Sequence, residues 1–250
     1  MIFEDWGLIP YQDALEKQLS YVEKLSLSID KNETHPGYLI FCSHPPVVTT
    51  GRQTQLHDIF AWKGEVIEIS RGGRATYHGP SQIVVYPILN LKNPRGLKTD
   101  SSGKITSESR VAQDIRGYLR SFEAAIVDTL KHYSIEATGK TPQKMPGQQT
   151  ETDETGVWIN QQKIASLGIA VKKWITYHGA AINFTNDPHA FTGINPCGFK
   201  TETMVNVEKI LEQRQNSTQA PNDTHLFQKS IESLKLEFKE SLRQKLQLYL

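Results

Sequence analysis

Cysteine is scarce in this sequence of 250 residues, which contains only Cys42 and Cys197. Two cysteines so far apart make neither a disulfide framework nor a zinc-type ligand spacing. An excess of one charge is also lacking, since 28 lysines and arginines and 27 aspartates and glutamates give a formal net charge of +1. This balance argues against a broad electrostatic surface for nucleic acid.

Long apolar runs are absent as well. No segment approaches the length of a membrane span, and the N-terminus carries early acidic residues without the apolar centre of a signal peptide. We therefore expect a soluble, cytoplasmic protein. A chain of this length can bury a substantial core.

Helix-like and strand-like patterns alternate along the chain. Apolar residues at helical spacing predict helices over 11–27, 111–133, 204–211 and 224–250. Short apolar or alternating runs predict strands over 37–42, 47–52, 66–70, 82–89 and 164–171, with a hairpin over 156–165. Polar stretches predict an exposed loop over 91–109 and a loose segment over 138–155, which is either disordered or covers a site. The interleaving predicts an α/β (α+β) fold with a mixed sheet and packed helices.

Cys197 is a candidate nucleophile because it lies in the turn-forming string Ile194-Asn195-Pro196-Cys197-Gly198. The flanking proline and glycine predict a sharp bend that exposes the thiol. Lys163 opens the apolar run 164–171, and partial desolvation there would let its neutral amine act as a base for a thiol. Plainer interpretations stay open, since most buried cysteines are inert and most lysines are surface charges. Cys42 lies in a predicted strand and is interpreted as an inert core thiol.

Two loop motifs suggest ligand binding. Arg71-Gly72-Gly73-Arg74 allows the backbone to approach a ligand closely, and its arginines suit an anion. The tetrapeptide Thr76-Tyr77-His78-Gly79 is repeated as Thr176-Tyr177-His178-Gly179. Either each copy closes a turn beside a strand, or both copies line one pocket with free backbone amides.

The sequence resembles the octanoyltransferases, also called lipoate-protein ligase B, over most of residues 5–210. The main signature is Arg71-Gly72-Gly73-x-x-Thr76-Tyr77-His78-Gly79-Pro80-x-Gln82-x-Val84-x-Tyr86-Pro87. Three further motifs agree in the family's order: Lys163-Ile164-Ala165-x-Leu167-Gly168, Tyr177-His178-Gly179 and Ile194-Asn195-Pro196-Cys197-Gly198. Two fainter ones are His44-Pro45-Pro46-Val47 and Thr50-Gly51-Arg52.

The resemblance implies transfer of an octanoyl group from octanoyl-acyl carrier protein to a lysine of lipoyl domains, in protein lipoylation and lipoate biosynthesis. Acceptors would be the lipoyl domains of 2-oxoacid dehydrogenases and the glycine cleavage H protein. It implies a fold similar to the catalytic domain of biotin and lipoate protein ligases. That single domain would span 1–250, with loose insertions near 92–109 and 139–155 and a helical extension from about 212. We expect a monomer without metal or cofactor, and neither a nucleic acid nor a membrane as partner.

The resemblance also assigns residues. By motif, Cys197 matches the family's acyl-thioester nucleophile, and Lys163 matches the lysine that lowers the pKa of that thiol. Three segments match the family's substrate-binding loops: Arg71, Gly72, Gly73, Arg74, Ala75, Thr76, Tyr77 and His78; Ser166, Leu167 and Gly168; and Gly179, Ala180 and Ala181. Their small residues suit an acyl tunnel between strands, which bulky side chains would fill.

Some features depart from the family's pattern. Arg74 stands where a neutral or smaller polar residue is common, Ser81 replaces a usual glycine, and the two polar stretches are longer than the norm. These departures concern partner contacts and the detail of the pocket rather than the nucleophile.

A thiolate suits a ping-pong acyl transfer because it is both a nucleophile and a good leaving group. Backbone amides near Gly79 and Cys197, or the ring of His78, are candidates for stabilising the oxyanion. One alternative is an ATP-using lipoate or biotin ligase on the same fold, which would need no cysteine. Others are a non-catalytic protein that binds lipoyl domains or acyl carriers, and a cysteine hydrolase with His78 as base. The presence of both Cys197 and Lys163 argues against the first two.

Overall fold

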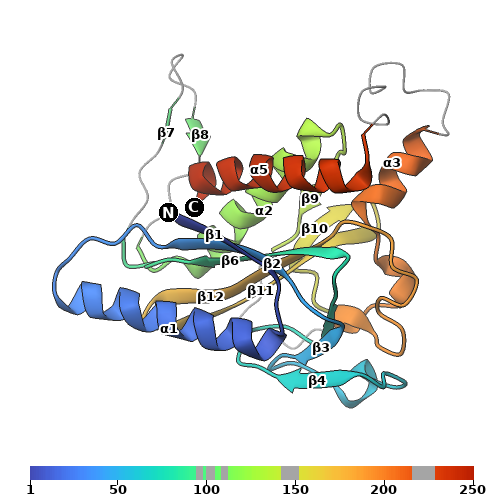
Figure 1. The fold of residues 1–250 in the computed structure, drawn as a ribbon, viewed down its shortest axis with the longest axis horizontal. Helices are drawn as coiled ribbons and strands as arrows, with labels where there is room; N and C mark the ends of the chain where they lie inside the picture. The colour runs from blue at the N-terminus through green and yellow to red at the C-terminus, as the bar shows by residue number, and fades with distance from the viewer. Residues whose placement is uncertain (94–97, 100–104, 108–111, 142–151, 216–228) are drawn as a thin grey trace.

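A computed structural model describes residues 1–93, 98–99, 105–107, 112–141, 152–215 and 229–250. Its centre is a seven-stranded sheet with the order β1-β2-β6-β12-β11-β10-β9 (Figure 1). Strands β1 and β2 are parallel and the other neighbours are antiparallel, so the predicted mixed sheet is confirmed. The strands span Ile2–Leu8 (β1), Tyr38–Ser43 (β2), Gln82–Ile88 (β6), Thr138–Gly139 (β9), Gly156–Ile159 (β10), Gln162–Lys172 (β11) and Ile175–Asn183 (β12).

A smaller sheet lies beside the large one and has the order β4-β3-β5. Its strands are β3 (Val47–Thr50), β4 (Glu65–Glu68) and β5 (Thr76–His78). Three short 3-10 helices, η1 (Leu56–Asp58), η2 (Pro196–Gly198) and η3 (Thr201–Thr203), occur in the connections. The paired prolines at 45 and 46 separate β2 from β3, because proline cannot donate to a ladder and breaks the strand.

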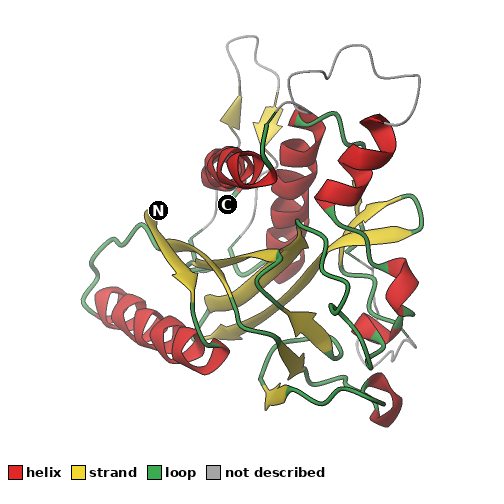
Figure 2. Cartoon of the chain, turned by 45° about the vertical axis from the view of Figure 1, so that its right-hand side comes forward, coloured by secondary structure: helices red, strands yellow, loops and turns green. Residues whose placement is uncertain are grey.

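Helices cover both faces of the large sheet (Figures 1 and 2). Helix α1 (Tyr11–Asp30) packs on β12 and β6, as its apolar stripe predicts. Helices α2 (Ile115–His132) and α5 (Ile231–Tyr249) pack on each other and on the opposite face, and α3 (Val207–Gln215) lies beside them. The Asp114 carboxylate accepts from the Gly117 amide at 2.7 Å, and this cap places the start of α2 at Ile115. In the described part of the chain, no helix is long and apolar enough to cross a membrane.

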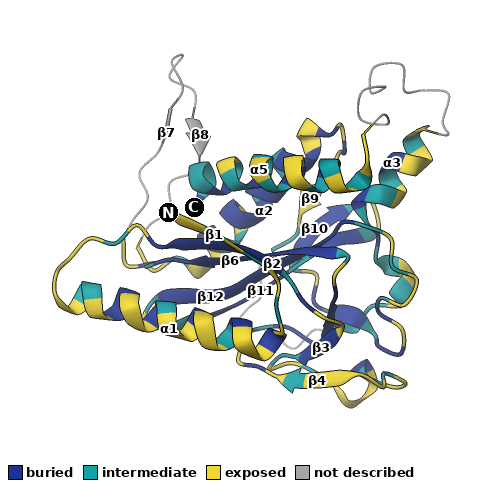
Figure 3. Ribbon diagram, viewed as in Figure 1, coloured by how far each residue is buried: buried dark blue, intermediate teal, exposed yellow. Residues whose placement is uncertain are grey.

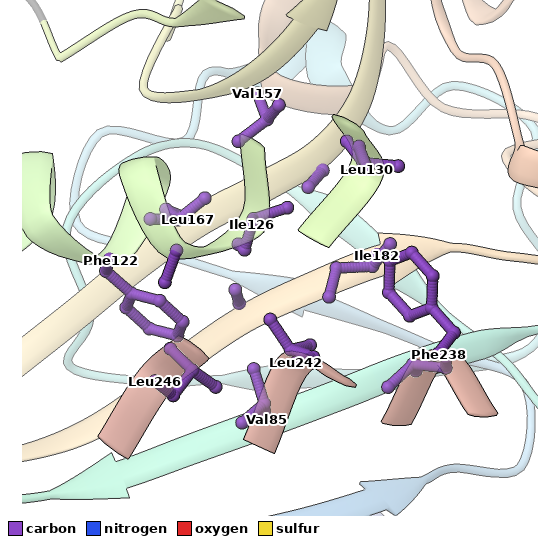
Figure 4. Packing of buried hydrophobic residues seen from close by; sticks show 14 of the residues in the cluster. Val85, Phe122, Ile126, Leu130, Val157, Leu167, Ile182, Phe238, Leu242 and Leu246 are labelled. Atoms are coloured by element: carbon purple, nitrogen blue, oxygen red, sulfur yellow. The ribbon is translucent and has the colours of Figure 1, made fainter. Parts of the chain in front are cut away.

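The two faces of the sheet bury different residues. The larger core cluster joins α2 and α5 to the sheet, and among its members Figure 4 labels Phe122, Leu246, Leu167 and Ile182. The second cluster joins α1 to the other face, and Ala181 belongs to it. Strands β11 and β12 are buried on both faces (Figure 3), because successive side chains alternate between them.

The exposed loop expected over 91–109 is partly wrong. Leu91 is fully buried in the larger core cluster, and β7 (Lys98–Thr99) pairs with β8 (Ile105–Ser107) as a short hairpin. Other bounds differ by a few residues: the strand predicted at 66–70 is β4, and the helices predicted from 204 and 224 begin at Val207 and Ile231. Residues 142–151 of the loose segment, and 224–228 of the last predicted helix, lie outside the described residues.

Candidate active site

Cys197 occupies a strained turn, as its neighbours predict. The residue has a left-handed backbone conformation (φ 56°, ψ 20°) within η2. Non-glycine residues adopt this conformation at a cost, and such strain gathers at functional sites. The turn is fixed from two sides, because the Cys197 amide donates to the Ala75 carbonyl at 2.8 Å and the Asp153 amide donates to the Cys197 carbonyl at 2.8 Å.

The expectation that the turn exposes the thiol is wrong. Cys197 is only 5% exposed, because the segment around Asp153 covers one side of the turn and β5 the other. The thiol faces β11, where Cys197 Sγ lies 3.7 Å from Ser166 Oγ. The nucleophile candidate therefore opens onto an internal cavity rather than onto the surface.

Lys163 is fully buried, as its place at the start of an apolar strand predicts. The β10–β11 register shifts between Val157 and Trp158, so one extra residue is inserted in β11 near Ile164. Such a bulge re-aims the side chains that follow it. Lys163 and Ser166 would lie on opposite faces of a regular strand, and the extra residue returns them to the same face.

Asp153 connects the lysine to the cysteine. Lys163 Nζ donates to the Asp153 carbonyl at 2.7 Å, and the amide of the same residue donates to the Cys197 carbonyl. The lysine ammonium also lies 5.5 Å from the ring centre of Trp158 and 5.7 Å from that of Phe199. Among the described residues no hydrogen bond joins Lys163 Nζ directly to Cys197 Sγ. Lys163 Nζ and the Cys197 backbone are therefore linked through Asp153, which hydrogen-bonds to both.

A cavity of about 410 Å³, part of it open to solvent, extends from Cys197 between α1, β5, β11 and β12. Ten of the residues expected at the site line it: Arg71, Thr76, His78, Ser166, Leu167, Gly168, Gly179, Ala180, Ala181 and Cys197. The two copies of the repeated tetrapeptide meet at this cavity. Strand β5 contributes Thr76 and His78 to the wall, and β12 contributes His178 and Gly179. The amide of Gly79 is not free, because it donates to Gln82 Oε1 at 3.3 Å.

Arg71 lines the cavity wall, as does Asp153, and is 6% exposed. Its guanidinium donates to the carbonyls of Gly72 and Thr49 and to Thr49 Oγ1, at 2.9 to 3.0 Å. All these hydrogen-bond partners are neutral. The Asp153 carboxylate lines the same cavity, so the wall carries groups of both charge signs. The Arg71 guanidinium is the group of the wall that would favour a partly negative ligand atom beside it.

Arg74 has a different environment. Its guanidinium forms a buried ion pair with Asp58 through both Nε and Nη2, and Nη2 also lies 2.9 Å from His57 Nε2. Tyr77 turns to a separate cluster around Phe191 and donates to Asp187 Oδ2 at 3.0 Å. Five expected binding residues are thus not among those that line the cavity: Gly72, Gly73, Arg74, Ala75 and Tyr77.

Sequence reasoning missed several lining residues, namely Tyr11, Val84, Tyr86 and Asp153, whereas His178 belongs to the repeated tetrapeptide that was considered as a pocket lining. Tyr11 is the first residue of α1 and stacks on His78 with ring centres 5.4 Å apart. Val84 and Tyr86 are two residues apart on β6, and this spacing could have placed them on one face. The position of Asp153 depends on how distant segments meet, for which the sequence carries no local signal.

Three histidines gather beside Tyr11, away from Cys197. His44 Nε2 lies 2.7 Å from the Tyr86 hydroxyl, and His178 Nδ1 lies 3.4 Å from the Tyr11 hydroxyl. Burial lowers the pKa of His44 to about 4, and burial together with the Arg71 charge lowers the pKa of His178 to about 3. Burial lowers the pKa of His78 in the same direction. All three rings are therefore neutral at pH 7, and as neutral rings they can line an apolar ligand.

Within the described residues, no group of three or more His, Cys, Asp or Glu side chains could hold a metal ion. The polar groups at the cavity are a thiol, several hydroxyls, neutral imidazoles, an arginine and the Asp153 carboxylate, with a lysine bound to the Asp153 carbonyl. This set suits covalent acyl transfer.

Comparison with known proteins agrees with this chemistry. Residues 14–223 match the family model described as the lipoyl protein ligase A/B catalytic domain. The chain is 50% identical over 211 residues to the octanoyltransferase of Bdellovibrio bacteriovorus, covering 84% of this chain and 89% of that protein. It is 34% identical to a chloroplastic octanoyltransferase of Arabidopsis thaliana, covering 93% of this chain and 75% of that protein.

Solved structures show the same fold at low identity. The crystal structure of lipoate-protein ligase A bound with ATP matches with a TM-score of 0.57 and 14% identity, covering 98% of this chain and 84% of that one. The expected lipoate-ligase fold is thereby confirmed, while the activity is given by the much more similar octanoyltransferases. The chain therefore belongs to the lipoyl protein ligase A/B catalytic family and, within it, to the octanoyltransferases, the acyltransferases of protein lipoylation.

Proposed function

We propose that this octanoyltransferase carries the octanoyl group as a thioester on Cys197, between an acyl carrier protein and a lipoyl-domain lysine. One observation supports this most strongly. The Cys197 thiol stands on a strained turn at an internal cavity whose walls carry small residues. The other cysteine has no such environment, because Cys42 is buried in a core cluster and burial raises the pKa of its thiol.

In the first half-reaction, the Cys197 thiolate attacks the carbonyl carbon of octanoyl-acyl carrier protein. The tetrahedral intermediate collapses, the donor's C–S bond breaks, and the carrier thiolate takes up a proton as it leaves. In the second, the lysine amine of a lipoyl domain attacks the new thioester, an amide forms, and Cys197 leaves as a thiolate while the amine loses a proton. A thiol serves both halves because it is easily displaced.

Lys163 is proposed as the base that moves these protons. It takes the thiol proton before the first attack and accepts the amine proton in the second half-reaction. Its complete burial, and its link to the Cys197 turn through Asp153, support this role.

Ser166 is proposed to assist the thiolate. Its hydroxyl accepts from the Cys197 thiol at 3.7 Å, and the same hydroxyl can donate once the thiol has lost its proton. The amides of Cys197 and Gly198 donate to the carbonyls of Ala75 and Asn195. The turn's own amides therefore offer the oxyanion less than expected, and Arg71 is a charged donor in the cavity wall.

The small side chains of the wall are proposed to hold the acyl chain. Ser166 pairs with Ala181 and Gly168 pairs with Gly179 across β11 and β12, which leaves a shallow channel toward α1. Leu167 and Ala180 belong to the core cluster against α2 and α5, so their side chains lie on the other face. We propose that the acceptors are the lipoyl domains of 2-oxoacid dehydrogenases and the glycine cleavage H protein. We also propose that the enzyme is a cytoplasmic monomer with a single domain.

Transfer from octanoyl-acyl carrier protein to a lipoyl domain tests these assignments. Cys197→Ala and Lys163→Met should each lose at least roughly 10²-fold in rate, while Cys42→Ala keeps it. Lys163→Met preserves the apolar stem, so a lost rate would not come from a cavity. Alkylation of Cys197 by iodoacetamide at pH 7 should be slower in Lys163→Met than in the wild type. Equal alkylation rates would contradict the proposed role of Lys163 as the base. Octanoyl transfer by Cys197→Ala would contradict the proposed thioester intermediate.

A further inference from the structure

The distance from Cys197 to the far end of the cavity can be counted in residues along β11. Ser166 touches the Cys197 thiol and pairs with Ala181, whereas His178 pairs with Ile169, three residues further along β11. At about 3.3 Å per residue, this end lies about 10 Å from the nucleophile. An extended octanoyl chain has seven C–C bonds of about 1.5 Å and spans about 9 Å from carbonyl carbon to methyl. A chain attached to Cys197 and directed along the strands would end at His178.

His178 reaches this place through an unusual backbone conformation. Strict alternation would put its side chain on the face of Ile169 and Ala180, toward α2 and α5. Its φ of 59° turns the ring toward α1 instead, where Nδ1 lies 3.4 Å from the Tyr11 hydroxyl. The His178 amide donates to Gln18 Oε1 at 2.8 Å, which holds the backbone in place. A left-handed histidine within a strand is uncommon and needs such support.

The same end of the cavity is polar. His178 Nε2, His78 Nδ1 and Gln18 Nε2 are buried and have no hydrogen-bond partner among the described residues. Both histidines line the cavity, and they are 2% and 7% exposed. An acyl chain that ran further would press its methylenes against unpaired nitrogens, and burying such atoms against hydrocarbon is unfavourable.

We propose that His178, held by Tyr11 and Gln18, is the end wall of the acyl cavity and limits the transferred chain to about eight carbons. The proposal rests on the proposed function, because the length is counted from Cys197. It makes His178 a specificity-determining residue of the octanoyl transfer, acting by its ring volume and its unpaired nitrogen.

The test compares octanoyl-, decanoyl- and dodecanoyl-carrier protein as donors to a lipoyl domain. His178→Gly removes the ring and keeps the left-handed backbone unstrained. The decanoyl-to-octanoyl rate ratio should rise roughly tenfold or more, as expected for space opened for two methylenes. Ile169→Ala is the matched control, since it lies opposite His178 but faces α2 and α5. It should leave the ratio unchanged.

His178→Asn serves if the glycine variant does not fold, because asparagine tolerates this backbone conformation and is shorter. Its decanoyl-to-octanoyl rate ratio should also rise.

Intact masses of the enzyme distinguish a failure of the proposed function from a failure of the end-wall proposal. Absence of acyl-Cys197 with every donor would overturn the proposed function and the length argument with it. Acyl-Cys197 that forms while both His178 variants keep the wild-type ratio would overturn the end-wall proposal alone.

Discussion

Replacing Arg74 by methionine should destabilise the fold rather than weaken substrate binding. The guanidinium is 3% exposed and forms two hydrogen bonds to Asp58, which is itself fully buried. Without it, the Asp58 carboxylate keeps one hydrogen-bond donor among the described residues, the Gln55 amide at 2.9 Å, while His57 Nε2 lies 4.0 Å away. Removing one partner of a buried ion pair costs about 3–5 kcal/mol of unfolding free energy. For a chain of this size that lowers the melting temperature by roughly 6–20 °C.

The assay is urea unfolding of Arg74→Met beside Arg52→Met, together with the KM for octanoyl-carrier protein. Arg52 is an exposed arginine near the same loop, and its replacement should change the unfolding free energy by less than about 0.5 kcal/mol. The reasoning would be refuted by an Arg74→Met protein of wild-type stability with a raised KM. That result would make Arg74 a substrate contact, as the family resemblance implies.

Two further predictions follow from the faces of β12 and from the buried histidines. Ala181→Leu should slow octanoyl transfer with a nearly unchanged melting temperature. Ala180→Leu should instead overpack the core, lower the unfolding free energy by about 1–3 kcal/mol and leave the chain-length preference unchanged. The reverse pattern would show that Ala180, and not Ala181, faces the acyl cavity. The folded-state pKa values of His44 (about 4) and His178 (about 3) lie below the unfolded value of about 6.5. The two histidines should therefore contribute their full share of the unfolding free energy above pH 6.5. Below that pH, each histidine should lower the unfolding free energy by about 1.4 kcal/mol per pH unit as the pH drops toward 4. Urea unfolding at pH 7 and pH 5 measures this loss, which His44→Gln should reduce; equal stabilities at both pH values would contradict it.

The sequence predicted the elements that have strong periodicity. The stripe of α1 and the apolar run of β6 are found where expected, because each pattern reflects a face that must be buried. Cys197 and Lys163 were singled out by a turn motif and by the start of a strand. Their role remains a prediction, although the structure brings both to one buried segment.

Other features depend on tertiary contacts that no local pattern encodes. The bulge that re-aims Lys163 arises from pairing with β10, and the burial of Cys197 arises from the covering segment at Asp153. The partner of Arg74 lies in η1, so a motif could assign the residue to a substrate loop but could not show its ion pair. The backbone of His178 likewise follows from contacts with α1.

Intact-mass spectrometry after incubation with octanoyl-acyl carrier protein tests the central claim most directly. The wild-type enzyme and Cys42→Ala should each gain the mass of one octanoyl group, and peptide mapping should locate it on Cys197. Addition of a lipoyl domain should discharge that mass to the acceptor. Cys197→Ala should gain no mass, and a Cys197→Ala protein that still became acylated would contradict the account.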